Sequence, residues 1–506
     1  MGKNIFNSVQ LEKPKKNVFD LSHDVKMSMK MGNLTPVLVT ECVPGDSFQI
    51  GCDSLIRFAP MVAPVMHRMD VSVHYFFVPN RLTWDNWEKY IVDANTPNPL
   101  PYINYTDDFT ADQKKFLDYM GVPPNTGTGI TQALNALPIA AYQAIYNEYY
   151  RDENLVSEVD YNLADGNNTG DVVDLVKMRQ RAWEHDYFTA SLPFAQKGTA
   201  VDIPIGTIDQ DVAVQYNSLE NLYSEVYSGG AGVPDTFIAV GRSAAVNATG
   251  TPDMFAKTSE LEIAPTTIND LRRAFRLQEW LEKNARGGTR YIENILMHFG
   301  VRSSDKRLQR PEYITGLKTP VIISEVLNTS ATDQEAQGNM AGHGVAVSTG
   351  KYGNYFCEEH GYIIGIMSVM PQPAYQQGIP KTYLKSDPLD FFWPSFAHIG
   401  EQPVTNNELY AYTATAEDTF GYVPRYAEYK YQPSRVAGDF RTVLDYWHLG
   451  RIFATQPALN QAFIECDPDQ VERIFAVQDG EDNLYCQIMH KIKAVRPMPK
   501  FGTPNF

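Results

Sequence analysis

The sequence predicts a mainly β protein, either a β-sandwich or a jelly roll, that carries large and partly helical insertions. Short runs of branched and aromatic residues are separated by Gly and Pro, as in sandwiches and barrels. Helical patterns are placed between these runs, and the chain shows no internal repeat with a period of about 20–50 residues. The 506 residues, 43% of them hydrophobic, suffice for a large packed core.

The first strand signals lie at 37–43 and 47–51, on either side of the turn pair Pro44-Gly45. Apolar residues occupy alternate positions at 69–77, and this period of two predicts a half-buried strand that ends before Pro79. Further strands are expected at 321–326, 362–370 and 472–477.

Three short helices are expected before residue 150. One follows Thr83, where tryptophan and isoleucine residues have helical spacing. Thr110 and Gln113 form the pattern of a capping box at the start of the second. The third begins at Pro138 and carries apolar and tyrosine side chains along one face.

Two later regions have an unusual composition. Small and turn residues predominate from about 198 to 265, which indicates a long insertion that begins with a short strand at 201–208. Another stretch is dense in aromatic residues, namely Phe391, Phe392, Trp393, Tyr422, Tyr426, Tyr429, Tyr431 and Trp447.

Segment 271–301 predicts two amphipathic helices joined by a glycine pair. Gly287 or Gly288 can adopt the left-handed conformation that ends the first helix, and Gly300 can end the second. Thr289 can cap the second helix. The pattern therefore predicts a helical elbow.

Five arginines lie in or beside this elbow: Arg272, Arg273, Arg276, Arg286 and Arg290. A DNA-reading helix-turn-helix is an alternative interpretation of the segment. Such motifs usually expose polar, base-reading side chains at the start of the second helix. Here the second helix begins with Arg-Tyr-Ile-Glu, which favours a structural elbow.

The bulk charge restricts any contact with nucleic acid to local surfaces. The net charge is −17 and the pI is about 5.1, whereas duplex-DNA binders usually present a basic face. Residues 1–31 are locally basic and predict an arm. Five scattered cysteines without a C-x-x-C pair argue against a disulfide framework or a tight zinc site. We expect no signal peptide and no membrane insertion, because no apolar run approaches about 20 residues.

No motif predicts an enzyme, a metal site or a bound cofactor. The segment from Gly344 to Lys351 resembles a phosphate loop, but five residues separate its glycines where the loop needs four. Histidines at i, i+4 spacing and a G-x-S-x-G elbow are both lacking. A carbohydrate-binding or carbohydrate-active β-protein stays open as an alternative, because carboxylates occur among aromatic residues at Glu312, Glu401, Glu408 and Glu428.

Several blocks, in a fixed order, resemble the major capsid protein of the Microviridae, small bacteriophages with circular single-stranded DNA, and in particular the gokushovirus-like branch. The resemblance covers about residues 8–500. The blocks are ARGGTRY with HFGV and LQRPEY (285–313), FFVPNRLTWDNWEKYI (76–91), HDYFTASLPFAQKG (185–198), AYQQGIP (374–380), DFFWPSFAHIGEQPV (390–404), FGYVPRYAEYKYQPS (420–434) and DYWHLGRIF (445–453).

The resemblance implies an eight-stranded antiparallel viral jelly roll of residues 32–506, preceded by the basic arm of residues 1–31. Sixty copies would self-assemble into a T=1 icosahedral shell around the DNA, in the cytoplasm of a host bacterium. A surface insertion at about 207–262, before the helical elbow at 269–300, would contribute to host attachment. A small basic DNA-packaging protein, an internal scaffolding protein, a pilot protein and a cell-surface receptor would be further partners.

Packaged DNA needs positive charge on the inner face of a shell. The expected DNA contacts are Lys13, Lys15, Lys16, Lys491, Lys493, Arg496 and Lys500. The five arginines of the elbow are expected at contacts between subunits and as anchors of its helices. No catalytic, metal or cofactor residue is expected.

Overall fold

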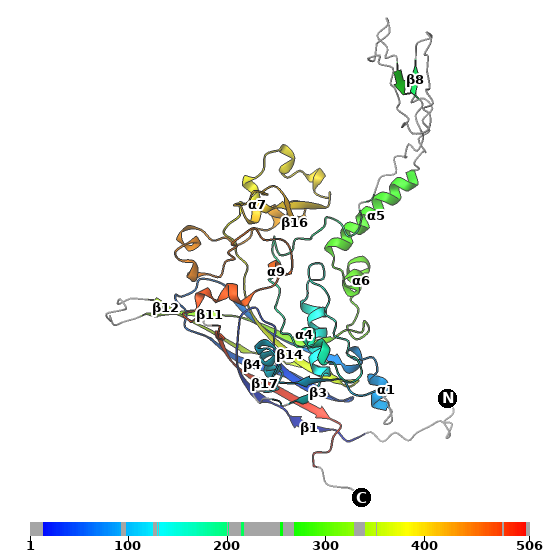
Figure 1. The fold of residues 1–506 in the computed structure, drawn as a ribbon, viewed down its shortest axis with the longest axis vertical. Coiled ribbons are helices and arrows are strands. Elements are labelled where there is room, and N and C mark those ends of the chain that lie inside the picture. Colours follow the sequence, from blue (N-terminus) through cyan, green and yellow to red (C-terminus); the bar gives the residue numbers. More distant parts are fainter. Residues whose placement is uncertain are drawn as a thin grey trace, which may run out of the picture. The chain divides into compact units, whose positions relative to one another are not determined.

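The computed structural model describes residues 14–92, 98–124, 129, 131–199, 201, 214–216, 254–256, 268–327, 340–350, 352–477 and 480–501. The contacts divide the chain into two units, one of residues 1–197 and 282–506 and one of residues 198–281. The first unit holds two large antiparallel sheets (Figure 1). The second contains the paired strands β8 (Val214–Tyr216) and β9 (Met254–Ala256) and most of helix α5 (Ile268–Arg286).

The larger sheet has seven strands. Its main path is β1 (Asn17–Asp20), β17 (Leu484–Arg496), β4 (Ser47–Phe58), β12 (Met340–Thr349) and β11 (Ile322–Leu327), while β2 (His23–Met29) also pairs with β17 and β13 (Gly353–Phe356) with β4. The smaller sheet has the order β10 (Glu312–Pro320), β5 (Met69–Pro79), β14 (Gly361–Pro371) and β3 (Thr35–Cys42). The mainly β prediction is therefore confirmed, and every strand pair of these two sheets is antiparallel.

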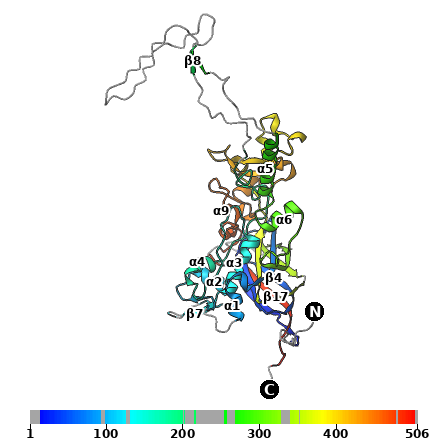
Figure 2. The ribbon, with the colours of Figure 1, turned by 90° about the vertical axis from the view of Figure 1, so that its right-hand side faces the viewer.

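The two central strands of the smaller sheet, β5 and β14, are buried on both faces. One face of β5, with Val73 and Phe77, contributes to a core shared with the larger sheet. The other face, with Phe76 and Val78, packs in a second core with helices α2 (Ala111–Tyr119), α3 (Leu137–Ile145) and α4 (Val172–Leu175) (Figure 2). The expectation that 69–77 is half-buried was wrong, because the helical insertion covers the side of the strand that period two assigned to solvent.

The expected helix signals are largely confirmed. Helix α1 (Trp87–Val92) follows Thr83, and α3 has Pro138 in its first turn. At the start of α2, the hydroxyl oxygen of Thr110 accepts from the N–H of Gln113 at 3.2 Å. The Gln113 side chain accepts in return from the N–H of Thr110 at 2.9 Å, which completes the capping box.

The elbow forms with one difference in its caps. Gly288 has a φ of +103° before α6 (Tyr291–Phe299), and Gly300 ends α6 with a φ of +67°. Thr289 does not cap α6, and its hydroxyl instead donates to the Asn154 side chain at 3.1 Å. The cap comes from Glu293, whose carboxylate accepts from the N–H of Arg290 at 3.2 Å. A carboxylate in the first turn also suits the positive end of the helix dipole.

Two other expectations were wrong. Residues 472–477 do not form a strand, because Asp467 and Pro468 start the 3₁₀ helix Pro468–Ile474, whose residues Val471 and Ile474 are buried. Part of the expected arm lies in the larger sheet, since β1 and β2 both pair with β17. Strand β17 itself was missed, because lysines at alternating positions resemble a basic tail rather than a strand.

The remaining elements are short and lie in the connections. They are β6 (Tyr102–Tyr105), β7 (Gln132–Asn135), β15 (Glu401–Thr405), β16 (Thr419–Pro424), α7 (Asn406–Leu409), α8 (Ala427–Lys430) and α9 (Gln461–Ile464). Residues of β15, β16, α7, α8 and α9 share a third apolar core with Tyr187, Phe188 and Tyr375. The long connection between β14 and β17 is thus a folded layer with its own core.

Buried histidines predict that the subunit loses stability in mild acid. The Nε2–H of His490 donates to the carbonyl of Val37 at 2.9 Å, and Nδ1 of the neutral ring accepts from the hydroxyl of Tyr75 at 3.0 Å. Burial lowers the pKa of His490, His67 and His74 to about 4. The unfolded chain binds these protons near pH 6.5, so stability is complete above that pH and falls between 6.5 and 4.

We expect a loss of about 1 kcal/mol per histidine for each pH unit in the lower part of that window. Thermal unfolding of the subunit at pH 7.5, 6.5, 5.5 and 5.0 measures it. Burial raises the pKa of Glu153 and Glu312, which acts in the opposite direction. The His490→Gln variant separates these effects, since its stability should depend less on pH. A wild-type stability that stays constant from pH 7.5 to 5.0 would contradict the prediction.

Candidate interaction surfaces

The outer face of the larger sheet is open, in contrast to that of the smaller sheet. Along β17 the side chains from Leu484 to Ala494 alternate between buried and solvent-facing positions. The solvent-facing set includes Tyr485, Gln487 and Lys493, which are all exposed. The described helices that share a core with a sheet pack on the smaller one (Figure 2). This face is therefore open, and the register also places exposed apolar side chains on it, with Val347 beside Leu55 and Ile322 beside Val345.

The basic residues of β17 point in two directions. Lys491 and Lys493 lie on the open face, where Lys491 forms an ion pair with Asp53 of β4. Arg496 lies at the end of the strand and contacts two other groups, the Asp46 carboxylate at 3.3 Å and the Glu41 carbonyl at 2.6 Å. Arg496 is thus held within the subunit, although it belongs to the same basic run.

The basic residues near the two ends of the chain also differ. Lys13 lies outside the described residues, and Lys15 is exposed. Lys16 donates to the carbonyl of Gly45 at 2.6 Å and lies 5.3 Å from the centre of a phenylalanine ring. Lys500 is exposed. Of the expected DNA contacts, Lys15, Lys16, Lys493 and Lys500 are thus the exposed ones among the described residues, and Lys16 is the one of these that also binds a backbone carbonyl.

The arginines of the elbow divide by position. Arg272, Arg273 and Arg276 are exposed on α5, where Arg276 pairs with Glu279 of the same helix at 2.6 Å. Arg286 forms an ion pair with Glu401 and donates to the carbonyl of Ala190 at 2.9 Å. Arg290, the fifth of these arginines, also anchors the elbow.

That residue, Arg290, occupies a site rich in acceptors. Its side chain contacts the Glu153 carboxylate at 2.5 Å and donates to the carbonyl of Asn147 at 2.6 Å. Arg286 and Arg290 therefore tie the elbow to the body of its own subunit. The expected role of these two arginines as helix anchors agrees with these contacts.

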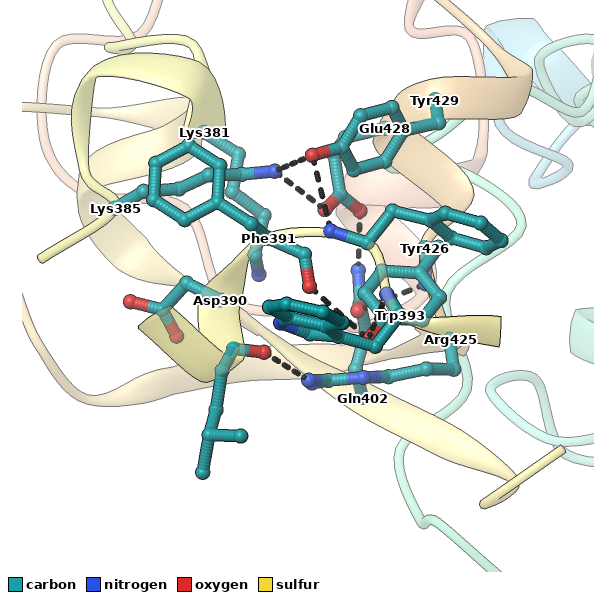
Figure 3. Close-up of polar contacts among 12 residues, drawn as sticks. Lys381, Lys385, Asp390, Phe391, Trp393, Gln402, Arg425, Tyr426, Glu428 and Tyr429 are labelled. Atoms are coloured by element: carbon teal, nitrogen blue, oxygen red, sulfur yellow. Dashed lines mark hydrogen bonds and ion pairs between the residues drawn. The ribbon is translucent and has the colours of Figure 1, made fainter. Parts of the chain in front are cut away.

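The aromatic stretch forms what we call the aromatic loop cluster, residues 381–431 (Figure 3). Tyr426 is buried at its centre and has a left-handed backbone conformation, with a φ of +61°. The hydroxyl of Tyr426 accepts from the N–H of Trp393 and donates to the carbonyl of Phe391, both at 3.2 Å. The N–H of Tyr426 donates to Gln402 of β15 at 3.0 Å. These bonds fix the loop that carries the exposed rings.

A lysine joins the other side of the cluster. Lys385 donates to the Tyr429 hydroxyl at 2.9 Å, contacts the Glu428 carboxylate at 3.3 Å and lies 4.0 Å from the centre of the Tyr429 ring (Figure 3). The side chains of Phe391, Phe392, Trp393 and Tyr429 are all about half exposed. A rigid, exposed group of aromatic rings is typical of a protein contact surface.

The comparisons with known proteins cover almost the whole chain. A family model described as "Capsid protein (F protein)" matches residues 7–506. Capsid protein VP1 of Bdellovibrio phage phiMH2K is 36% identical, over 96% of this chain and 94% of that protein. The VP1 proteins of Chlamydia phage 1 and Spiroplasma virus 4 are 34% and 30% identical, over 99% and 96% of this chain and 98% and 94% of those proteins.

The chain belongs to the Microviridae capsid protein family. It is a structural major capsid protein, it is located in the virion, and it assembles into a capsid that encloses the phage genome. No helix among the described residues is long and apolar enough to cross a membrane.

Three of the four carboxylates that suggested a carbohydrate site, Glu401, Glu408 and Glu428, have structural partners in the capsid protein. Glu401 pairs with Arg286, and Glu428 pairs with Lys385. Glu408 is buried and accepts from the Tyr187 hydroxyl at 2.8 Å and from Lys381 at 3.1 Å. Within the described residues, no group of three or more His, Cys, Asp or Glu side chains could hold a metal ion. These glutamates hold the loops between β14 and β17 together.

Sequence reasoning missed several exposed residues of the capsid subunit. Tyr485, Arg57 and Lys26 lie on the open sheet face, and Ile322 and Val326 lie on the edge strand β11. The alternation of apolar and polar residues at 484–496 is a signal that could have revealed β17.

Proposed function

We propose that sixty copies of this chain build a T=1 icosahedral shell around circular single-stranded DNA. The observation that carries this proposal is the match with phage capsid proteins along nearly the whole chain. The two-sheet architecture supports it, because the core between the sheets is a self-contained scaffold from which long connections reach outward.

We further propose that the two sheets form an eight-stranded jelly roll. The strands β2, β17, β4 and β12 are neighbours in one sheet, and β3, β14, β5 and β10 are neighbours in the other. Along the chain, β2, β4, β12 and β17 alternate with members of the other sheet. This arrangement supports a roll made of two Greek keys, with β1, β11 and β13 as additions. In our proposal the capsid domain includes β1 and β2 in addition to residues 32–506, and the basic arm is limited to the residues before β1.

Contacts between copies would use exposed apolar surfaces of the subunit. Strand β11 is the last strand of its sheet, and among the described residues no strand pairs with its outer edge. Ile322 and Val326 on β11 are 71% and 51% exposed, and Val347 on the adjoining β12 is also exposed. An apolar edge strand pairs readily with another chain and is normally protected. We propose that a second copy covers this β11–β12 hairpin (Figure 1).

The aromatic loop cluster and Arg272, Arg273 and Arg276 are further proposed contacts between copies. Their exposure on the subunit supports this role. The insertion at about 207–262, most of which lies outside the described residues, is proposed to contribute to host attachment. The proposed partners outside the shell subunit are a small basic DNA-packaging protein, an internal scaffolding protein, a pilot protein and a cell-surface receptor.

Electron microscopy of particles made in a host that expresses the phage genes tests the proposal. We expect closed icosahedral particles with sixty copies of the chain, and a density that follows the two-sheet core. Particles with a different number of copies would contradict the T=1 proposal. A chain that stays monomeric in the presence of the other phage proteins would contradict assembly itself.

A further inference from the structure

Two cysteines meet at a corner of the fold, although most of the chain separates them in sequence. Cys42 is the last residue of β3 in the smaller sheet, and Cys357 directly follows β13 in the larger sheet. Both side chains are fully buried in the core between the two sheets. A pair of this kind comes from the topology of the fold and has no local sequence signal.

The backbone brings the two segments together independently of the side chains. Cys42 lies opposite Gly361 of β14, just beyond the turn that follows Cys357. The N–H of Cys357 donates to the Asp46 carbonyl at 2.9 Å, and the Cys357 carbonyl accepts from the N–H of Gly45 at 2.8 Å. The turn between β3 and β4 therefore lies against the turn between β13 and β14, and each turn crosses from one sheet to the other.

The two side chains also touch. The Cys42 thiol forms a hydrogen-bond contact with the Cys357 thiol. Neighbouring side chains in a close-packed core hold each other in one arrangement. Sulfur atoms that are kept in contact can form a covalent bond with little movement of the backbone, whereas cysteines on distant segments cannot.

We propose that Cys42 and Cys357 form a disulfide after the capsid protein leaves the reducing interior of the cell, and that this inter-sheet disulfide links the two sheets covalently. Thiols stay reduced in the cytoplasm and become oxidised outside it. A protein of the virion passes from the first environment to the second. One bond of this kind differs from the disulfide framework that the sequence argues against. It lies within one subunit and does not depend on the number of copies in the shell.

The bond forms in two balanced steps when hydrogen peroxide is the oxidant. The thiolate of one cysteine attacks an oxygen atom of the peroxide, the O–O bond breaks, and the hydroxide that leaves takes up the thiol proton as water. The other thiol then attacks the sulfur of the sulfenic acid, and a second water leaves as the S–S bond forms. The two sulfur atoms lose two electrons, and the peroxide gains them.

Burial determines how fast this reaction proceeds. Burial and, after it, the contact with the Cys357 thiol raise the pKa of the Cys42 thiol. The thiolate is the reactive form, so the native subunit is oxidised slowly and only when local opening of the corner admits the peroxide. The same property keeps the pair reduced while the protein folds.

The inter-sheet disulfide should raise the thermal stability of the subunit. A cross-link restricts the unfolded chain, and the effect increases with the length of the loop that it closes. The loop between Cys42 and Cys357 contains most of the chain, including strands of both sheets. We expect the midpoint of thermal unfolding to rise by about 5 °C on oxidation.

Peptide mapping of the wild-type protein tests the bond without any substitution. The protein is treated with hydrogen peroxide until the exposed Met66 is fully converted to its sulfoxide, which shows that the dose suffices. It is then denatured in N-ethylmaleimide without reductant and digested. Mass spectrometry should find a peptide pair that joins Cys42 to Cys357, two hydrogen atoms lighter than the separate peptides and absent after reduction with dithiothreitol. Alkylated or singly oxidised cysteines at both positions, or a disulfide confined to other cysteines, would overturn the proposal.

Thermal unfolding of two variants tests the effect on stability. Each peroxide-treated protein is measured before and after dithiothreitol, which reduces a disulfide and leaves methionine sulfoxide unchanged. Wild type and Cys486→Ala should lose the rise of about 5 °C on reduction, whereas Cys42→Ala should show no difference. Cys486 is a matched control, because it is also buried but lies opposite Ile56 in the larger sheet. A difference in Cys42→Ala equal to that of wild type would overturn the proposal, and peptide mapping of the wild type decides the matter if Cys42→Ala does not fold.

Discussion

The double variant Ile322→Lys with Val326→Lys is expected to abolish particle formation and to leave the subunit folded. Both side chains lie on the same side of the edge strand β11 and are largely exposed, so charged replacements cost the isolated subunit little. In a shell they would lie inside the contact with the next copy. Burying an unpaired ammonium group there costs several kcal/mol, and each shell repeats that cost at every copy.

The measurement combines two readouts. Circular dichroism and thermal unfolding report whether the subunit is folded, and sedimentation with electron microscopy reports whether particles form. Val173→Lys is the matched control, because Val173 of α4 is also an exposed valine but lies on the helical side of the smaller sheet. A normal yield of particles from the double variant would show that β11 is not at a contact between copies.

Local signals predicted the elements that depend on a few neighbouring residues. The capping box of Thr110 and Gln113 and the left-handed Gly300 both formed as expected, because each involves atoms within one turn of chain. Local reasoning failed for Thr289, where the competing acceptor on Asn154 comes from a distant segment. The period of two at 69–77 located β5, but the burial of both faces depends on helices whose position no local pattern reveals.

The open sheet face shows even more clearly what local sequence patterns cannot predict, because its residues come from distant segments of the chain. Lys26 and Gln487 are neighbours across a strand pair, although they are separated by most of the chain. Sequence reasoning selected Lys491, Lys493 and Arg496 as one basic run, and their order along a strand sends the last of them to a different environment. Residue type identifies these three side chains as cations and no more. Only the register separates a cation that faces solvent from one that holds the fold together.

Because Arg496 and Lys493 lie in different environments, we expect their substitutions to have opposite effects on folding stability and on DNA binding. Arg496→Gln should lower the free energy of unfolding by about 3 kcal/mol, since it leaves the Asp46 carboxylate without its ion-pair partner. Asp46 is fully buried, and its carboxylate also accepts from the N–H of Val43 at 3.1 Å in the turn between β3 and β4. The uncompensated charge would therefore destabilise the turn that connects the two sheets.

Lys493→Gln should leave the stability of the subunit almost unchanged and weaken DNA binding. Lys493 is exposed on the open face, and exposed charges contribute little to folding, so the free energy of unfolding should change by less than about 0.5 kcal/mol. Its loss should instead weaken binding of oligo(dT) and reduce the dependence of that binding on salt by about one phosphate contact. Urea unfolding and anisotropy titrations on both variants measure the two quantities. If Arg496→Gln weakened DNA binding and left unfolding unchanged, the effects predicted for the two variants would be wrong. Arg496 is held by Asp46 and the Glu41 carbonyl, so its substitution should affect DNA binding only through the stability of the fold.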